Sequence, residues 1–235
     1  MELERRAFVK GAAATAAGGA LGLLGVVSGA EPALAATSPT LRQGSHGTAV
    51  RSLQRRLSYL GYWCGAVDGV FGGMTRSAVI ALQKVARIAR DGICGPVTWS
   101  KVRAGVRPAA RTHSGHVIEV HRDRQVLLVV DSGRVRTILA ASTGSENPYY
   151  SQGRWWSART TPGRYRVYLQ RNRWDSGPLG SLYRPMYFNG GIAVHGYTSV
   201  PTYPASHGCV RVSIAAMNLL WLGGRMGIGT GVNVY

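Results

Sequence analysis

Apolar residues recur at two different spacings along the chain. Between residues 48 and 104 they follow steps of three and four positions, as in Val50, Leu53 and Leu57, which is the spacing of one buried helix face. Beyond residue 116 this spacing gives way to runs of β-branched residues at 117–120, 126–130 and 135–140. The pattern therefore predicts a helical first part and a mainly β second part.

Turn and cap residues divide the helical part into three helices. Gly61 closes the first helix, as glycine often does just past a helix end. Thr75 is a candidate cap for the second helix, whose apolar face includes Val79 and Leu82. A third, short helix contains Trp99. The sequence thus predicts a small three-helix domain over residues 40–104, followed by a linker over 105–113.

The second part, residues 114–235, reads as strands with one helix. Asp131-Ser132-Gly133 separates two apolar runs and predicts a hairpin turn. Further strands are expected at 163–169, 186–188, 192–195 and 232–235, with a helix over 213–222. The expected fold class is α+β in two domains, the second being a β sandwich or a β barrel.

The first 35 residues have the pattern of an export signal. Arg5-Arg6-Ala7-Phe8-Val9-Lys10 precedes an uncharged run rich in Ala and Gly, and Ala33-Leu34-Ala35 has the small-x-small pattern of a cleavage site. The segment resembles a twin-arginine signal, which implies export to the cell wall or the extracellular space. The alternative is a single membrane anchor, although the run has few large apolar side chains.

The charge is strongly positive. The chain has 28 Lys+Arg against 10 Asp+Glu, a formal net charge of +18, with 16% charged and 45% hydrophobic residues, which excludes a disordered, charge-rich chain. A basic protein attracts polyanions. For an exported protein these would be anionic wall polymers and not nucleic acid; the alternative is a basic surface with no specific partner.

Three cysteines are an odd number for an exported protein. Cys64 and Cys94 lie in turns of the helical part, and the simplest assignment pairs them in a disulfide, with two buried thiols as the alternative. His46 would add only a third ligand to these two cysteines, so we expect no metal site and no cofactor. Cys209 is left unpaired.

Cys209 is a candidate nucleophile. It lies in Ser206-His207-Gly208-Cys209-Val210-Arg211, and His195 precedes it by 14 residues. A thiolate attacks carbonyl carbon, and an imidazole can take the thiol proton and later return one to a leaving amine. Gly208 allows a backbone N–H to face the developing oxyanion, and Arg211 can bind a substrate carboxylate. The alternative is a buried structural cysteine near a structural histidine.

The helical part resembles a peptidoglycan-binding module. The resemblance rests on Leu41-Arg42, Leu60-Gly61-Tyr62, Val67-Asp68-Gly69 and Gly95-Pro96-Val97-Thr98-Trp99, with Leu82 where the family more often has Phe. It covers about 60 residues and implies binding to the peptide stems or the glycan of the cell wall.

The second part resembles the L,D-transpeptidase (YkuD) catalytic domain. The motifs are Ile192-Ala193-Val194-His195-Gly196 and the string from Pro204 to Arg211, with support from Ala141-Ser142-Thr143-Gly144 and Thr161-Pro162-Gly163. The resemblance implies that Cys209 is the nucleophile and His195 the acid and base.

The same resemblance assigns roles to neighbouring residues. His207 would shape the oxyanion site, and the Gly196 carbonyl would orient the His195 ring. Arg211 stands where the family often has Asn, and we expect it to bind substrate. The other expected substrate-binding residues are Ser206, Tyr187 and Phe188, although alternation along a strand turns either Tyr187 or Phe188 into the core.

The implied reaction joins two peptide stems of peptidoglycan. Cys209 would attack the carbonyl before the terminal D-Ala of a tetrapeptide stem and form a thioester; a side-chain amine of a second stem would then form a 3→3 cross-link. If water attacks instead, the enzyme is an L,D-carboxypeptidase. The family also implies roles in wall organisation and cell shape, and acylation of Cys209 by penems and carbapenems.

Two rival functions remain at this point. A sortase also uses His, Cys and Arg on a β barrel, but there the His usually lies far upstream and the motif around the Cys differs. The second rival is a non-catalytic wall-binding protein. The aromatic residues at 148–150, 155–156 and 174 have two interpretations, a rim that grips substrate or ordinary packing of loops.

Overall fold

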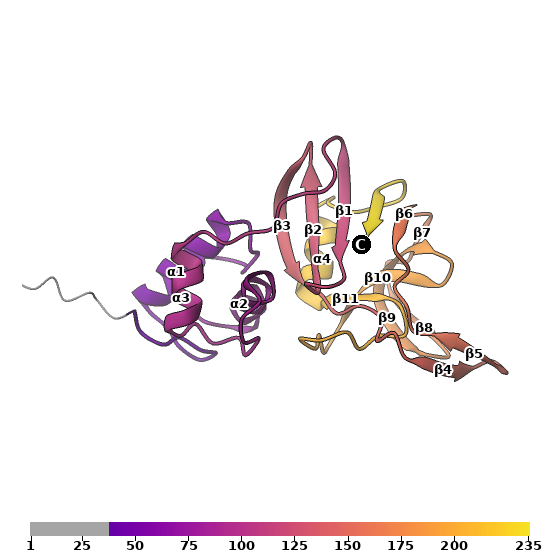
Figure 1. Cartoon of the computed structure of the whole chain (residues 1–235), viewed down its shortest axis with the longest axis horizontal. Helices are drawn as coiled ribbons and strands as arrows, with labels where there is room; N and C mark the ends of the chain where they lie inside the picture. Colours follow the sequence, from indigo (N-terminus) through magenta and orange to yellow (C-terminus); the bar gives the residue numbers. More distant parts are fainter. Residues whose placement is uncertain (1–37) are drawn as a thin grey trace, which may run out of the picture. The chain divides into compact units, whose positions relative to one another are not determined.

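The structure is a computed structural model that describes residues 38–235 (Figure 1). The predicted export signal lies outside these residues. Within 38–235 no helix has both the length and the apolar character needed to cross a bilayer.

Three helices form the first part of the described chain, as predicted: α1 (Thr48–Tyr59), α2 (Gly73–Ala86) and α3 (Pro96–Arg103). Gly61, with φ 88°, follows the end of α1. The expectation that Thr75 caps α2 is wrong, because the helix begins earlier and Gly72 is its N-cap. Thr75 is instead buried, and its hydroxyl accepts a hydrogen bond from Gln54 Nε2 at 3.0 Å.

The second part contains two larger sheets. The first has the order β3-β2-β1-β12-β6, and the second has the order β11-β10-β9-β7 with β8 also paired to β9. The strands of the first sheet are β1 (His116–His121), β2 (Val126–Asp131), β3 (Arg134–Ala140), β6 (Gly163–Arg166) and β12 (Gly231–Val234). Those of the second are β7 (Leu169–Gln170), β8 (Trp174–Gly177), β9 (Gly180–Asn189), β10 (Ile192–Tyr197) and β11 (Val210–Ser213).

The two sheets share one apolar core. Val129 of β2, Val194 of β10 and Val212 of β11 belong to the same buried cluster, so the β part is a sandwich rather than a closed barrel. Helix α4 (Ile214–Leu222) follows β11 and adds Met217 to this core. It begins where predicted, because the Ser213 hydroxyl accepts from the Ala216 N–H at 3.1 Å.

The fold class is therefore α+β with a helical and a mainly β domain, and the two domains are packed together. Strand β2 is buried on both faces: Leu127 and Val129 face the sandwich core, whereas Val126, Leu128 and Val130 belong to the core of the helices. The alternation of the strand separates the two sets. The helical domain thus covers the outer face of the first sheet.

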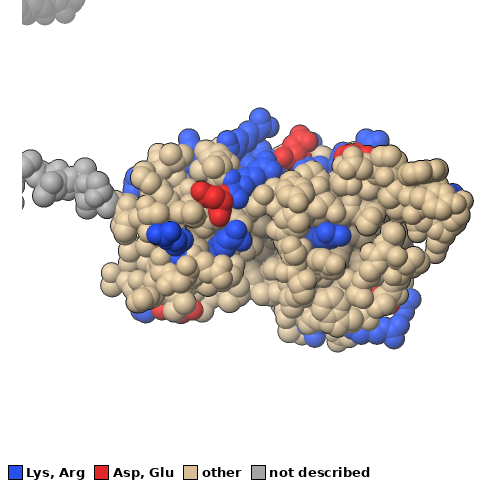
Figure 2. Space-filling view, turned by 90° about the horizontal axis from the view of Figure 1, so that it is seen from below, with Lys and Arg blue, Asp and Glu red and all other residues tan. Residues whose placement is uncertain are grey.

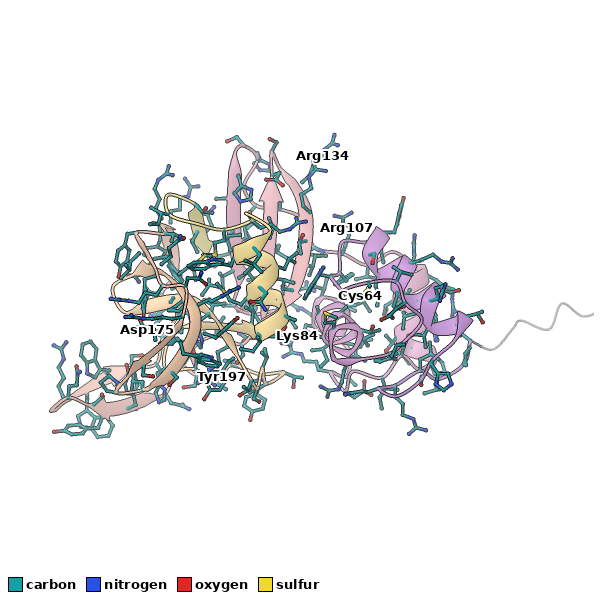
Figure 3. The ribbon with its side chains drawn as sticks, turned by 180° about the vertical axis from the view of Figure 1, so that it is seen from behind. Cys64, Lys84, Arg107, Arg134, Asp175 and Tyr197 are labelled. Atoms are coloured by element: carbon teal, nitrogen blue, oxygen red, sulfur yellow. The ribbon has the colours of Figure 1, made fainter. Side chains whose placement is uncertain are left out.

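Lys84 of α2 joins the two domains. Its side chain is fully buried, and Nζ donates to the carbonyl oxygens of Ala141 at 2.7 Å and Gln125 at 3.2 Å (Figure 3). Burial is the largest cause that lowers the pKa of this amine, to about 7, and Arg90 lowers it further. The amine can therefore lose its proton close to neutral pH.

The structure contradicts the predicted disulfide. Cys64 and Cys94 are both buried free thiols. The Cys64 sulfur lies 3.6 Å from the carbonyl oxygen of Gln54 and 3.3 Å from the Ser58 hydroxyl on α1, whereas Cys94 pairs through its backbone with Leu41. Each cysteine thus packs against a different segment and acts as a small apolar residue.

Candidate active site

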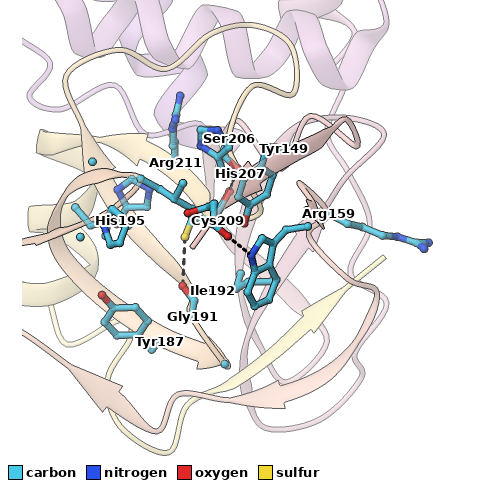
Figure 4. A pocket seen from close by; sticks show the side chains of 18 of the residues that line it. Tyr149, Arg159, Tyr187, Gly191, Ile192, His195, Ser206, His207, Cys209 and Arg211 are labelled. Carbon is cyan, nitrogen blue, oxygen red and sulfur yellow. Dashed lines mark hydrogen bonds between the residues drawn. The ribbon is translucent and has the colours of Figure 1, made fainter. Parts of the chain in front are cut away.

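A pocket of about 540 Å³ opens beside strands β10 and β11 (Figure 4). One side is formed by the two-stranded hairpin of β4 (Pro148–Ser151) and β5 (Arg154–Ser157), which the sequence analysis did not predict. Six of the residues selected from the sequence line this pocket: Tyr187, His195, Ser206, His207, Cys209 and Arg211.

Strand register brings the two main candidates together. Strands β10 and β11 run parallel, with Val194 opposite Val210 and His195 opposite Arg211. Because side chains alternate along a strand, Val194 and Val210 enter the core while His195, Cys209 and Arg211 share the opposite face. The His195 ring and the Cys209 sulfur therefore line the same pocket wall (Figure 4).

The His195 ring is held in one orientation and kept neutral. Its Nδ1 lies 3.0 Å from the Gly196 carbonyl oxygen, the contact predicted from the sequence, so Nδ1 carries the proton and donates. Burial lowers the pKa of His195 to about 4; the Gly196 contact opposes this and Arg211 adds to it. At neutral pH the Nε2 atom is therefore a free proton acceptor.

The Cys209 sulfur has two backbone neighbours. The Ala193 N–H donates to Sγ at 3.4 Å, and Sγ lies 3.7 Å from the Gly191 carbonyl oxygen. Burial raises the pKa of the Cys209 thiol, while the Ala193 N–H and Arg211 lower it. The resting site thus holds a neutral thiol beside a neutral imidazole, and not a preformed ion pair.

Side-chain hydroxyl groups fix the loop that carries Cys209. Ser206 Oγ donates to the Cys209 carbonyl oxygen and accepts from the Gly208 N–H at 3.0 Å. Thr160 Oγ1 donates to the Gly208 carbonyl oxygen at 2.6 Å. The Gly208 N–H, which we had expected to face the oxyanion, is therefore used inside the loop. Both hydrogen bonds of the Ser206 hydroxyl are also made within this loop.

Two positions of the site require glycine. Gly208 has φ 129°, and a Cβ atom there would lie 3.2 Å from the Arg159 carbonyl oxygen. At Gly196 a Cβ atom would lie 2.9 Å from the Tyr183 ring and 3.0 Å from Met217 Cβ. The close approach of backbone to neighbouring side chains at Gly196 keeps its carbonyl beside the His195 ring.

The remaining predicted residues divide between pocket and core. The Arg211 guanidinium lies 4.7 Å from the centre of the Tyr197 ring, and the His207 ring packs edge-on against Tyr149 at 4.7 Å. Tyr187 lines the pocket, and its hydroxyl donates to Asp175 at 2.8 Å. Phe188 is buried in the sandwich core, so its assignment as a substrate-binding residue is wrong; alternation along β9 turns it away from the pocket.

Two residues that shape the site, Tyr197 and Thr160, were not selected from the sequence, and a third, Tyr149, was left with two interpretations. Tyr197 follows His195 by two positions, so alternation along β10 was a signal that both share a face. Thr160 directly precedes the Thr161-Pro162-Gly163 motif, but nothing in its position marked its contact with the distant Gly208. Tyr149 could be a substrate-gripping rim residue or ordinary loop packing, and the structure places it in the pocket lining on a hairpin that was not predicted.

Metal chemistry has no candidate ligands in the part of the chain that the structure describes. Residues 38–235 contain no group of three or more His, Cys, Asp or Glu side chains that could hold a metal ion.

Comparison with known proteins agrees with this division of the chain. Residues 115–234 match the L,D-transpeptidase catalytic domain family (YkuD), and residues 46–102 match a putative peptidoglycan-binding domain. The crystal structure of an L,D-transpeptidase from Xylanimonas cellulosilytica is 49% identical, covers 83% of this chain and 97% of that chain, and superposes with a TM-score of 0.80.

Two curated relatives match a short stretch of the chain, and the chain spans about a quarter or less of the length of each. An N-acetylmuramoyl-L-alanine amidase, CwlM, from Mycobacterium tuberculosis is 47% identical over 53 residues, 23% of this chain and 13% of the relative. A zinc D-Ala-D-Ala carboxypeptidase from Streptomyces albus G is 46% identical over 67 residues, 28% of this chain and 26% of the relative.

These amidase and carboxypeptidase relatives share only the binding domain with this chain, so their own catalytic chemistry does not transfer to it. The catalytic-domain match covers half of the sequence, and the Xylanimonas enzyme matches both domains. The chain belongs to the L,D-transpeptidase (YkuD) family and carries a peptidoglycan-binding domain before its catalytic domain.

Proposed function

We propose that this protein is a cysteine-dependent L,D-transpeptidase that forms 3→3 cross-links in peptidoglycan through a thioester on Cys209. The observation that carries the proposal is the shared face of β10 and β11, where the Cys209 thiol, the His195 ring and the Arg211 guanidinium line one pocket. A pocket-facing thiol beside a neutral imidazole supports nucleophilic acyl transfer.

The first half of the reaction uses His195 as base and then as acid. Nε2 takes the Cys209 proton while sulfur attacks the carbonyl carbon that precedes the terminal D-Ala of a tetrapeptide stem. The C–N bond then breaks, the proton passes from Nε2 to the leaving amine, and free D-Ala departs. The neutral resting state fits this order, since a neutral His195 can accept the proton at the moment of attack.

Backbone and guanidinium groups stabilise the charges of this step. We assign the oxyanion contact to the Cys209 N–H, because the Gly208 N–H is bound to Ser206 Oγ. His207, packed against Tyr149, supports the shape of this corner. Arg211 binds the carboxylate of the leaving D-Ala, and its stacking on Tyr197 holds the guanidinium toward the pocket.

The second half transfers the acyl group to an amine. A side-chain amine of a second stem attacks the thioester carbon, His195 takes the amine proton, and the Cys209 sulfur leaves and recovers that proton. Attack by water in place of the amine would give an L,D-carboxypeptidase. The partition between the two products depends on how well the pocket binds the amine and excludes water.

The partner and the location follow from the same proposal. The substrate is peptidoglycan, whose stems enter the pocket while the helical domain holds the wall polymer. The protein acts outside the membrane after export by its twin-arginine-type signal. Its basic surface favours contact with anionic wall polymers.

Product analysis with purified disaccharide-tetrapeptide tests the proposal. Wild-type protein should release D-Ala and form dimers joined 3→3, measured by liquid chromatography and mass spectrometry. Cys209→Ala should form neither product, whereas Cys64→Ala, which removes a thiol far from the pocket lining, should retain both. Release of D-Ala with tripeptide and no dimer would favour the carboxypeptidase, and no release would contradict catalysis.

A further inference from the structure

A second pocket, of about 320 Å³, lies where the linker meets both domains. Its wall comes from four places: the linker at 106–111, the end of α2 at Val85, the β1–β2 turn region, and Tyr235 after β12. None of these residues lines the catalytic pocket. Figure 3 shows Arg107 where the chain passes from the helices to the sheet.

Three arginines and a histidine line this pocket: Arg107, Arg111, Arg124 and His121. Among the ion pairs of residues 38–235, none joins one of these arginines to a carboxylate. Arg107 donates to the Val135 carbonyl oxygen at 2.7 Å and Arg124 to the Val85 carbonyl oxygen. Each guanidinium has five N–H donors, so these bonds position the groups and leave donors for a ligand.

The pocket also presents an aromatic wall and an unpartnered ring nitrogen. The Arg111 guanidinium carbon lies 3.7 Å from the centre of the Tyr235 ring, and no side-chain hydrogen bond of Arg111 is seen within residues 38–235. The His121 ring packs against Tyr235 at 5.0 Å, and its buried Nδ1 has no hydrogen-bond partner. A buried polar atom without a partner calls for a ligand or an ordered solvent molecule.

Two acidic side chains lie near this pocket but do not line it. The Glu119 carboxylate is buried and accepts hydrogen bonds from the backbone N–H groups of Arg111 and Thr112 and from the Tyr235 hydroxyl. Asp123 is exposed and does not line the pocket. The chain as a whole is basic, and the face shown in Figure 2 displays more Lys and Arg than Asp and Glu.

We propose that this pocket binds a phosphodiester group of an anionic polymer. Three guanidinium groups from two chain segments, the linker and the β1–β2 turn, line one volume. A tetrahedral phosphate offers oxygen atoms in several directions to receive them, whereas a planar carboxylate suits a single bidentate arginine. The pocket is large enough for the phosphate and the ester carbons on either side of it, since a water molecule in the liquid occupies about 30 Å³.

The site would attach the enzyme to phosphate-rich polymer while leaving the catalytic pocket free for peptide stems. It also goes beyond the proposed function, because binding here needs neither Cys209 nor turnover. The binding test can therefore fail while the proposed reaction is confirmed, and the proposed reaction can fail while polymer binding is confirmed.

Calorimetric titration with a glycerol phosphate oligomer tests this site. The double variant Arg107→Gln/Arg111→Gln should bind the oligomer at least roughly tenfold more weakly than wild type, because it loses two of the three guanidinium groups. The matched control is Arg134→Gln/Arg164→Gln, which removes the same charge from two exposed arginines outside the pocket and should bind within about twofold of wild type. Unfolding temperature and circular dichroism establish that both variants fold.

Several results would overturn the proposal. They are no binding by wild type, an equal loss in both double variants, equal binding of acetate, or tighter binding to phosphatidylglycerol vesicles than to the oligomer. Inorganic phosphate should bind more weakly than the oligomer and shift the NMR signals of the His121 ring; an unmoved His121 ring would place the phosphate elsewhere.

Discussion

The two sheets of the catalytic domain are buried to different degrees. Strand β2 of the first sheet packs against the sandwich core on one face and against the helices on the other. Strand β10 of the second sheet buries Val194 in the core, but its other face carries His195 beside a pocket. The difference teaches that the doubly covered sheet provides stability, whereas the sheet with an open face provides the chemistry.

The sharpest way to test this comparison is to alter the open face. His195→Ala should lower turnover by about two to four orders of magnitude, because the thiol loses the group that takes its proton. The unfolding temperature should change little. The measurement is D-Ala release from tetrapeptide stems.

The pH profile of the wild type sharpens the same prediction. Since burial lowers the pKa of His195 to about 4, the acid limb of kcat/KM should lie nearer pH 4 than the 6.5 of a free imidazole. Turnover in His195→Ala equal to that of wild type would remove this residue from the mechanism.

The opposite response is expected from the first sheet, which is covered on both faces. Leu128→Ala should lower the free energy of unfolding by about 2–5 kcal/mol, because Leu128 is fully buried against the helices and its loss leaves a cavity. Turnover at a temperature where the variant is folded should stay close to wild type. Denaturant unfolding measures the first quantity; an unchanged midpoint would mean that the helices do not support this face.

Lys84 allows a pH test of the domain junction. Its pKa is about 7 in the folded protein and 10.5 when solvated, so between these values the unfolded chain binds the extra proton and folding stability rises with pH. The unfolding free energy of wild type, measured relative to Lys84→Met, should therefore increase between pH 7 and 10 by up to about 1.4 kcal/mol per pH unit. A difference that does not vary with pH would show that Lys84 is not buried at the junction.

The buried thiols provide the smallest expected effect. Cys94→Ala should cost about 1 kcal/mol of stability and leave D-Ala release unchanged, because Cys94 packs in the helical core. Burial raises the pKa of the Cys94 thiol to about 12, so it should also resist alkylation in the folded protein. Rapid alkylation of Cys94 in the native state would contradict this packing.

Local signals predicted much of the fold. Ser213 marked the start of α4, and Asp131-Ser132-Gly133 marked the turn between β2 and β3, where Ser132 and Gly133 both have positive φ. The β4–β5 hairpin was missed because its turn, Gln152-Gly153, has Gln where Asn or Asp would signal such a turn. That hairpin carries the aromatic residues at 149–150 and 155–156, for which the sequence had left two interpretations, a substrate-gripping rim or loop packing.

Information about distance was missing from the sequence. To decide whether Cys64 and Cys94 form a disulfide, one must know the distance between two turns. Only the packing of the helices determines that distance, and in the structure both thiols are free. Which of Tyr187 and Phe188 faces the pocket depended on the register of β9 against β10, where the pairing is interrupted by irregularities. Cys209 and His195, by contrast, could each be selected from one short sequence motif. The structure then brings the two motifs together on the neighbouring strands β10 and β11.

Intact-protein mass spectrometry after exposure to a carbapenem tests the nucleophile most directly. The account predicts one covalent adduct on wild type and none on Cys209→Ala, with the adduct retained in a Cys64→Ala/Cys94→Ala control, because only the Cys209 thiol among the three lines the catalytic pocket. Folded wild type without any adduct, or an adduct that persists in Cys209→Ala, would contradict it.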